Sequence, residues 1–72
     1  MDVTELKVRL FNEEVPHYMY SICDGDEEQR VCLRESGGKW LVYYCEDGEK
    51  LDTAEFSSES EACKEMYKRV AE

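Results

Sequence analysis

Residues 31–45 read VCLRESGGKWLVYYC, and this stretch decides the fold. Apolar, β-branched and aromatic residues fill both of its halves, and Gly37-Gly38 separates them. Two consecutive glycines favour a two-residue hairpin loop, because such loops need backbone conformations with positive φ. The stretch therefore predicts a β-hairpin with strands at about residues 29–35 and 40–45.

A two-residue loop at Gly37-Gly38 also fixes which residues lie opposite one another across the hairpin. The expected pairs are Leu33 with Val42, Val31 with Tyr44, Cys32 with Tyr43, and Arg34 with Leu41. Directly paired side chains lie on the same face of the sheet. The face expected to form the core holds Val31, Leu33, Trp40, Val42 and Tyr44. The other face, expected to be open, holds Arg30, Cys32, Arg34, Leu41, Tyr43 and Cys45.

Two further strands are expected on either side of the hairpin. Residues 18–23 are rich in strand-forming residues and are followed by the turn signal Asp24-Gly25. A weaker strand at about residues 50–56 follows a second turn signal, Asp47-Gly48. Together these segments predict three or four antiparallel strands in a meander.

A helix is expected at each end of the chain. Asp2 and Glu5 resemble a capping box that opens a helix at about residues 2–13, and Pro16 stops it. Ser58 and Glu61 form a second capping box, before an apolar stripe of Ala62, Cys63, Met66 and Val70. The sequence thus predicts one α+β domain over residues 1–72. Its order is an N-terminal helix, the antiparallel meander sheet, and a C-terminal helix packed on one sheet face.

Charge is the main functional signal. The chain has 18 acidic and 9 basic residues, for a net charge of −9. The excess lies in two stretches, residues 24–28 and 46–61, and the rest is nearly neutral. Such a surface repels nucleic acid and anionic lipid and attracts a basic protein patch. The alternative interpretation is a solvated acidic face that confers only solubility.

The four cysteines are expected to be free thiols in a cytoplasmic protein. Residues 1–5 show neither the basic nor the apolar region of a signal peptide, and no apolar run is long enough to span a membrane. The spacings between the cysteines are 8, 12 and 17 residues, without the close pair that structural zinc sites use.

No catalytic or calcium site is expected either. His17 stands alone in a loop, with no signature of a cysteine–histidine pair. Asp24, Asp26, Glu28 and Glu35 partly match a calcium loop, but Gln29 replaces its required glycine. The sequence therefore indicates neither an enzyme nor a cofactor or metal.

Residues 40–63 resemble a family of small bacterial immunity proteins that accompany polymorphic or contact-dependent toxins. The resemblance is carried by four features: the strand Trp40-Leu41-Val42-Tyr43-Tyr44, the turn Glu46-Asp47-Gly48, Phe56, and Glu61-Ala62-Cys63. Asp47 departs from the family pattern, which has a basic residue before this glycine. If that position touches the toxin, the toxin of this protein should differ in charge there.

The resemblance implies a protein that binds and blocks a cognate toxin domain. Many such toxins are nucleases with a basic substrate cleft, which an acidic surface can occupy. The residues expected to bind the partner are Asp24, Asp26, Glu27 and Glu28 in one group, and Glu46, Asp47, Glu49 and Asp52 in a second. Tyr43 is a possible aromatic anchor on the open face. The alternative function is a small acidic adaptor or regulatory protein that binds a basic protein unrelated to toxins.

Overall fold

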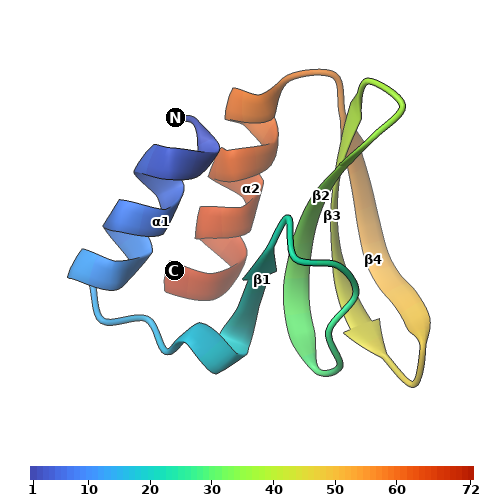
Figure 1. The fold of residues 1–72 in the computed structure, drawn as a ribbon, viewed down its shortest axis with the longest axis horizontal. Helices are drawn as coiled ribbons and strands as arrows, with labels where there is room; N and C mark the ends of the chain where they lie inside the picture. Colours follow the sequence, from blue (N-terminus) through green and yellow to red (C-terminus); the bar gives the residue numbers. More distant parts are fainter.

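The computed structural model describes residues 1–72 as a sheet with one helix against it and a second helix beside the first (Figure 1). The element order is α1 (Val3–Asn12), the 3-10 helix η1 (His17–Met19), β1 (Tyr20–Ile22), β2 (Arg30–Ser36), β3 (Lys39–Glu46), β4 (Glu49–Phe56) and α2 (Glu59–Ala71). Helix α2 contacts β2, β3 and β4, and α1 contacts α2. The predicted α+β class, with terminal helices around a sheet, is confirmed.

The hairpin of β2 and β3 has the predicted register. Leu33 pairs with Val42, and the other three expected pairs are also present. Gly37 and Gly38 have φ of 58° and 82°, which glycine adopts without the steric cost that a Cβ brings. Strand β4 continues the antiparallel meander on β3, with a bulge between Val42 and Tyr44.

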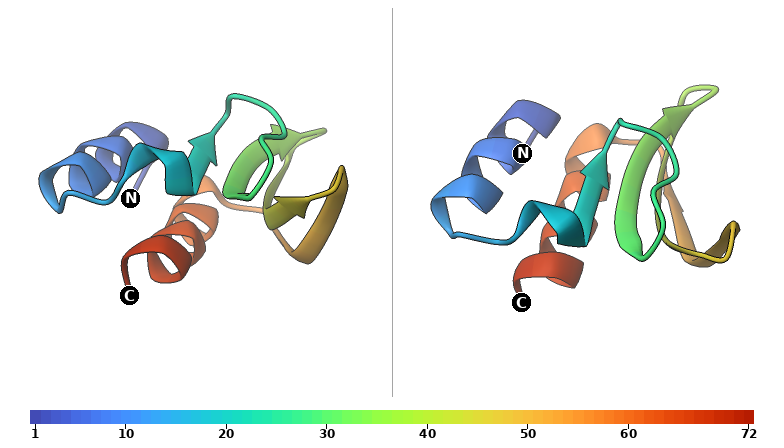
Figure 2. Two further views of the ribbon diagram at one scale, coloured as in Figure 1. Left: turned by 90° about the horizontal axis from the view of Figure 1, so that it is seen from below. Right: turned by 60° about the horizontal axis from the view of Figure 1, so that its bottom comes forward.

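The pairing of strand β1 differs from the sequence prediction. The strand pairs with β2 in parallel, with Tyr20 opposite Val31 and Ile22 opposite Leu33, so the sheet is not a pure antiparallel meander. Asp24-Gly25 does not close a hairpin. Residues 23–29 instead run back to the start of β2 (Figure 2). Parallel strands usually need a connection of a dozen or more residues. Seven residues suffice here because β1 is only three residues long.

The two helices begin at the predicted caps. The Asp2 side chain accepts a hydrogen bond of 2.8 Å from the Glu5 backbone N–H, and Ser58 Oγ accepts one of 3.1 Å from that of Glu61. The carboxylate of Glu59 also accepts a 2.8 Å bond from the backbone N–H of Val3. The first turn of α2 thus satisfies a free donor at the start of α1, which fixes the two helices together.

The main core lies between the helices and the sheet face of Leu33 and Val42. It consists of Leu6, Leu10, Ile22, Leu33, Val42, Ala62, Cys63, Met66 and Val70. The predicted stripe of α2 is buried in full. Val31 and Trp40 are half-buried and pack against this core, as expected from the register.

Truncating the centre of this core should remove a large part of the stability of the protein. Leu33 is buried, so Leu33→Ala should cost about 2–5 kcal/mol. The total stability of a 72-residue domain is of the same order, about 4–11 kcal/mol. Urea denaturation measures this loss. Leu51→Ala, at a side chain on β4 that is 38% exposed, is the control and should cost clearly less, about 1 kcal/mol. Equal losses from both variants would contradict the described core.

Candidate functional site

The second sheet face is covered by the loop of residues 23–29, and it is not open. Tyr43 is 0% exposed and forms a small buried cluster with Cys32 and Cys45. The Sγ of Cys32 contacts the carbonyl oxygen of Glu27 at 3.8 Å, which places the loop over this cluster. The prediction that Tyr43 is an accessible aromatic anchor is therefore wrong. The returning loop that β1 requires shields the tyrosine.

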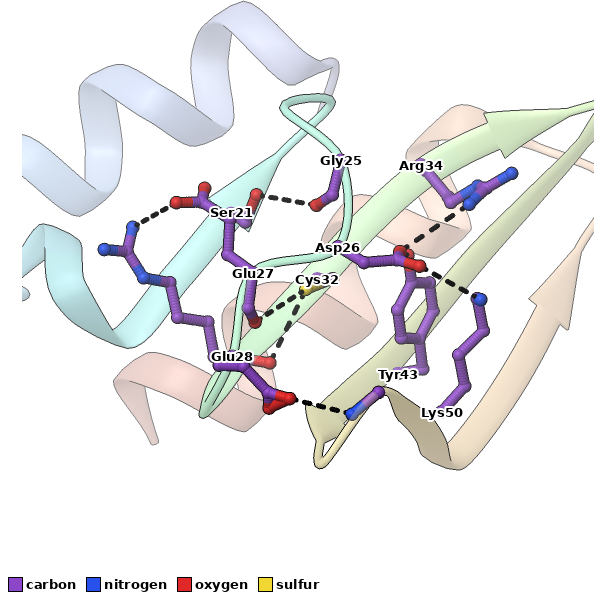
Figure 3. Close-up of polar contacts among 11 residues, drawn as sticks. Ser21, Gly25, Asp26, Glu27, Glu28, Cys32, Arg34, Tyr43 and Lys50 are labelled. Carbon is purple, nitrogen blue, oxygen red and sulfur yellow. Dashed lines mark hydrogen bonds and ion pairs between the residues drawn. The ribbon is translucent and has the colours of Figure 1, made fainter.

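Asp26 fastens the loop to this face (Figure 3). The hydroxyl of Tyr43 donates a hydrogen bond to Asp26 Oδ1. Lys50 Nζ lies 3.1 Å from Asp26 Oδ2, and Arg34 Nη1 lies 3.6 Å from Oδ1. The ammonium of Lys50 also stands 5.4 Å from the centroid of the Tyr43 ring. Asp26 thus joins side chains of β2, β3 and β4.

These contacts shift two pKa values in opposite directions. The hydrogen bond from Tyr43, followed by that from Lys50, lowers the pKa of Asp26 because both favour the charged carboxylate. Burial raises the pKa of Tyr43 to about 12, and its hydrogen bond to Asp26 adds to this effect. At neutral pH the pair is therefore a neutral phenol that donates to a carboxylate.

Glu28 joins the loop to the turn between β3 and β4. Its Oε2 accepts a 2.8 Å hydrogen bond from the backbone N–H of Asp47, and its Oε1 accepts a 2.7 Å bond from that of Gly48. Glu27 forms an ion pair of 3.2 Å with Arg30. The structure thus brings the two acidic stretches together. It also gives Asp26, Glu27 and Glu28 partners within the chain, so these three residues brace the loop.

The other predicted site residues carry charges without partners. Asp24, Glu46, Asp47, Glu49 and Asp52 are exposed, and none has an ion pair within 4 Å. Four of them, Glu46, Asp47, Glu49 and Asp52, lie at and just beyond the β3–β4 turn, and we call them the acidic turn. Asp24 stands apart, at the other end of the loop. The acidic turn is therefore the candidate site.

Two features make the acidic turn unusual. Glu46 lies directly opposite Glu49 across the hairpin, where like charges destabilise a pair of strands. Asp47 and Asp52 both have φ of 53°, a left-handed conformation that aspartate tolerates better than most residues. The turn thus concentrates negative charge at an energetic cost, on a backbone that Glu28 holds in place.

Sequence reasoning missed the roles of Lys50 and Arg34. Both lie on the second face, and their charges are matched to Asp26 across the sheet. The register places Arg34 on that face, and Lys50 pairs with Cys45, so the position of both was accessible from pairing. The position of their common partner, Asp26, was not accessible in this way, because the path of residues 23–29 depends on the parallel pairing of β1.

Comparisons with protein-family models, with curated proteins and with solved structures find no match to this chain. The structure contains no group of three or more His, Cys, Asp or Glu side chains that could hold a metal ion. Neither helix is long and apolar enough to cross a membrane. Any functional proposal therefore rests on the charges and geometry of this chain alone.

The Tyr43–Asp26 contact should make the protein sensitive to alkali. The folded pKa of Tyr43, about 12, exceeds the ordinary value of 10.0, so its stabilising effect is complete below pH 10 and is lost as the pH rises toward 12. Tyr43→Phe should remove this loss and cost about 1 kcal/mol at pH 7. Urea melts between pH 7 and pH 12 measure both effects. Tyr18→Phe, at an exposed ring, is the control. A wild-type alkaline slope that Tyr43→Phe leaves unchanged would refute the contact.

Relieving the Glu46–Glu49 repulsion should stabilise the fold. Glu46→Lys places an opposite charge across from Glu49, which should raise the free energy of unfolding by about 0.2–1 kcal/mol at low salt. Added salt should shrink the gain, because both side chains are exposed. Urea denaturation at two ionic strengths measures it. A destabilised Glu46→Lys variant would mean that these two carboxylates do not repel each other.

Proposed function

We propose that this protein is an immunity protein that neutralises a cognate toxin by presenting the acidic turn to a basic surface of that toxin. The observation that carries the proposal is the placement of Glu46 opposite Glu49, beside Asp47, with no counter-ion. The hairpin gains no stability from this arrangement. A basic partner would supply the missing counter-charge.

The mechanism follows from charge and rigidity. Exposed carboxylates in one place create a local negative potential, which speeds encounter with a basic protein. Glu28 holds the backbone of Asp47 and Gly48 through two hydrogen bonds, so little conformational entropy is lost when a partner binds. The acidic turn is thus suited to fast association with a preformed basic site.

The class of partner rests on the resemblance of residues 40–63 to bacterial immunity proteins. Where that family has a basic residue, this chain has Asp47, which lies at the centre of the acidic turn. A toxin matched to this chain would carry a basic residue against it. A nuclease toxin, whose cleft attracts phosphate, offers such a surface, and carboxylates would occupy that cleft in place of phosphates.

The alternative is a small acidic adaptor that binds a basic protein unrelated to toxins. It would use the same surface, because the acidic turn attracts basic proteins of any class. The identity of the partner distinguishes the two functions. A tagged pull-down with mass spectrometry identifies it. Expression of that partner in bacteria, with and without this protein, then shows whether it is a toxin that the protein neutralises.

Removing the charge of the acidic turn should slow association with that partner. The variant Glu46→Lys, Asp47→Asn, Glu49→Lys keeps an amino acid that tolerates positive φ at position 47. It should reduce the association rate constant at least tenfold at low salt, with a smaller effect on dissociation. Stopped-flow or surface plasmon resonance measurements test this. The difference should shrink as the salt concentration rises from about 50 mM to about 500 mM.

A matched control separates a located site from net charge. Glu14→Lys, Glu61→Gln, Glu72→Lys changes the net charge by the same amount at exposed carboxylates outside the sheet, and glutamine preserves the capping box at position 61. It should leave the association rate within about twofold. Equal slowing by both variants would mean that overall charge drives binding. If neither variant slows association, the acidic turn is not the interface.

A further inference from the structure

We propose that two copies of this chain associate through the groove between α1 and β1, with Phe11 of each copy inserted into the groove of the other. This inference goes beyond the proposed function and does not depend on it. The protein exposes five large apolar side chains. Four of the five lie in one segment of the chain, with the exposed fractions Val8 55%, Phe11 80%, Tyr18 68% and Met19 40%. The fifth, Leu51, lies on β4.

The four residues lie on two neighbouring elements. Val8 and Phe11 are three residues apart on α1, so they share one side of the helix. Tyr18 and Met19 belong to η1, directly after the turn that ends α1. The two aromatic rings alone expose roughly 300 Å², because an aromatic side chain presents about 200 Å². Val8 lines a different hollow from Phe11, so these side chains surround more than one hollow. Exposed apolar area of roughly this size matches the largest patch on a typical monomer, and such patches are often functional.

A hollow lies beside this patch. One groove of about 670 Å³ has Phe11, Tyr20 and Ile22 among its apolar walls. A second, of about 470 Å³, shares Phe11, His17 and Tyr20 with the first. Strand β1 is the edge of the sheet, so its other side has no neighbouring strand. The groove thus combines three apolar side chains, in an otherwise polar lining, with an unpaired strand edge.

The exposed ring and the groove are self-complementary. Phe11 is 80% exposed and lines the groove. The groove is also large enough to receive a phenylalanine ring from another molecule. In a two-fold interface the same patch meets itself, so a projection beside a hollow fits the hollow of the partner, and the reverse. An unrelated partner would need to provide both features. A second copy provides them already.

The charges around the groove also fit a second copy. Lys7, Arg30, Asp24 and Glu27 line it, but Arg30 and Glu27 already pair with each other at 3.2 Å. Lys7 and Asp24 have no ion pair within the chain. In a two-fold contact, Lys7 of one copy can pair with Asp24 of the other. The acidic turn lies across the sheet from α1, at the far side of the molecule (Figure 1). Association through the groove therefore keeps the acidic turns of the two copies apart. Contact through β4 would instead bring Glu49, Asp52 and Glu55 against the same residues of the second copy.

The expected dimer is weak. A specific, stable interface buries about 800 Å² per partner, which would be nearly a fifth of the 4531 Å² surface of this chain. The exposed rings of Phe11 and Tyr18 offer roughly 300 Å² of that area, so the contact falls below the standard size. We therefore expect a dissociation constant between about 1 μM and about 1 mM.

Sedimentation equilibrium of the purified full chain over this concentration range tests the proposal. The apparent mass should rise from 8.5 kDa toward twice that value. Phe11→Lys should weaken association at least tenfold, because it places an additional cation in an apolar contact. The variant should still fold, since Phe11 is mostly exposed, and circular dichroism melting checks this. Leu51→Lys is the matched control and should leave the dimer intact.

Each result decides the proposal. A wild-type chain that stays at 8.5 kDa up to about 1 mM overturns it. A dimer that survives Phe11→Lys overturns it as well. If Leu51→Lys dissociates the dimer, the interface lies on β4 and the proposal is overturned. None of these outcomes concerns toxin binding, so failure here leaves the proposed function standing.

Discussion

The hydrogen bond from the buried hydroxyl of Tyr43 to the carboxylate of Asp26 is the contact on which the rest of the structure depends. It holds the loop of residues 23–29 against the second sheet face. Without that cover, Tyr43, Cys32 and Cys45 would lie open to water. The same loop path brings the chain back to the start of β2, which is what allows β1 to pair in parallel. A single contact thus links the topology of the sheet to the burial of its second face.

This contact also divides the acidic residues into two kinds. Asp26, Glu27 and Glu28 have partners within the chain, and their charges are used to shape the loop. The residues of the acidic turn have none, and two of them oppose each other across the hairpin. A net charge of −9 alone could reflect only solubility. Exposed carboxylates elsewhere, such as Glu5, Glu14 and Glu61, also lack ion pairs. What sets the acidic turn apart is the placement of Glu46 directly opposite Glu49.

The sequence predicted what depends on local rules. Gly37-Gly38 set the register of β2 and β3 because a two-residue loop leaves one pairing, and the caps at Asp2 and Ser58 placed both helices. Strand β1 was misjudged because Asp24-Gly25 looks like a hairpin turn, and only the long-range pairing with β2 decides otherwise. The error about Tyr43 follows from the same cause. Alternation assigned the tyrosine to the correct face, but alternation does not reveal which loop covers that face.

The site was predictable in part for the same reason. Both acidic stretches are visible in the sequence, yet their contact through Glu28 and the backbone of Asp47 and Gly48 is not. The groove beside β1 was not anticipated, because it forms between residues of α1 and residues that follow η1. Sequence patterns identify what a surface contains. Which of those charges remain free depends on contacts between segments that are distant in the chain.

A double-mutant cycle between Asp26 and Tyr43 tests the central contact most directly. The free energy of unfolding would be measured at pH 7 for the wild type, Asp26→Asn, Tyr43→Phe and the double variant. If the pair fastens the loop, the double variant should lose less than the two single losses together, with a coupling energy of about 1 kcal/mol or more. Additive losses, with a coupling energy near zero, would contradict the account, because the loop would then be held without this hydrogen bond.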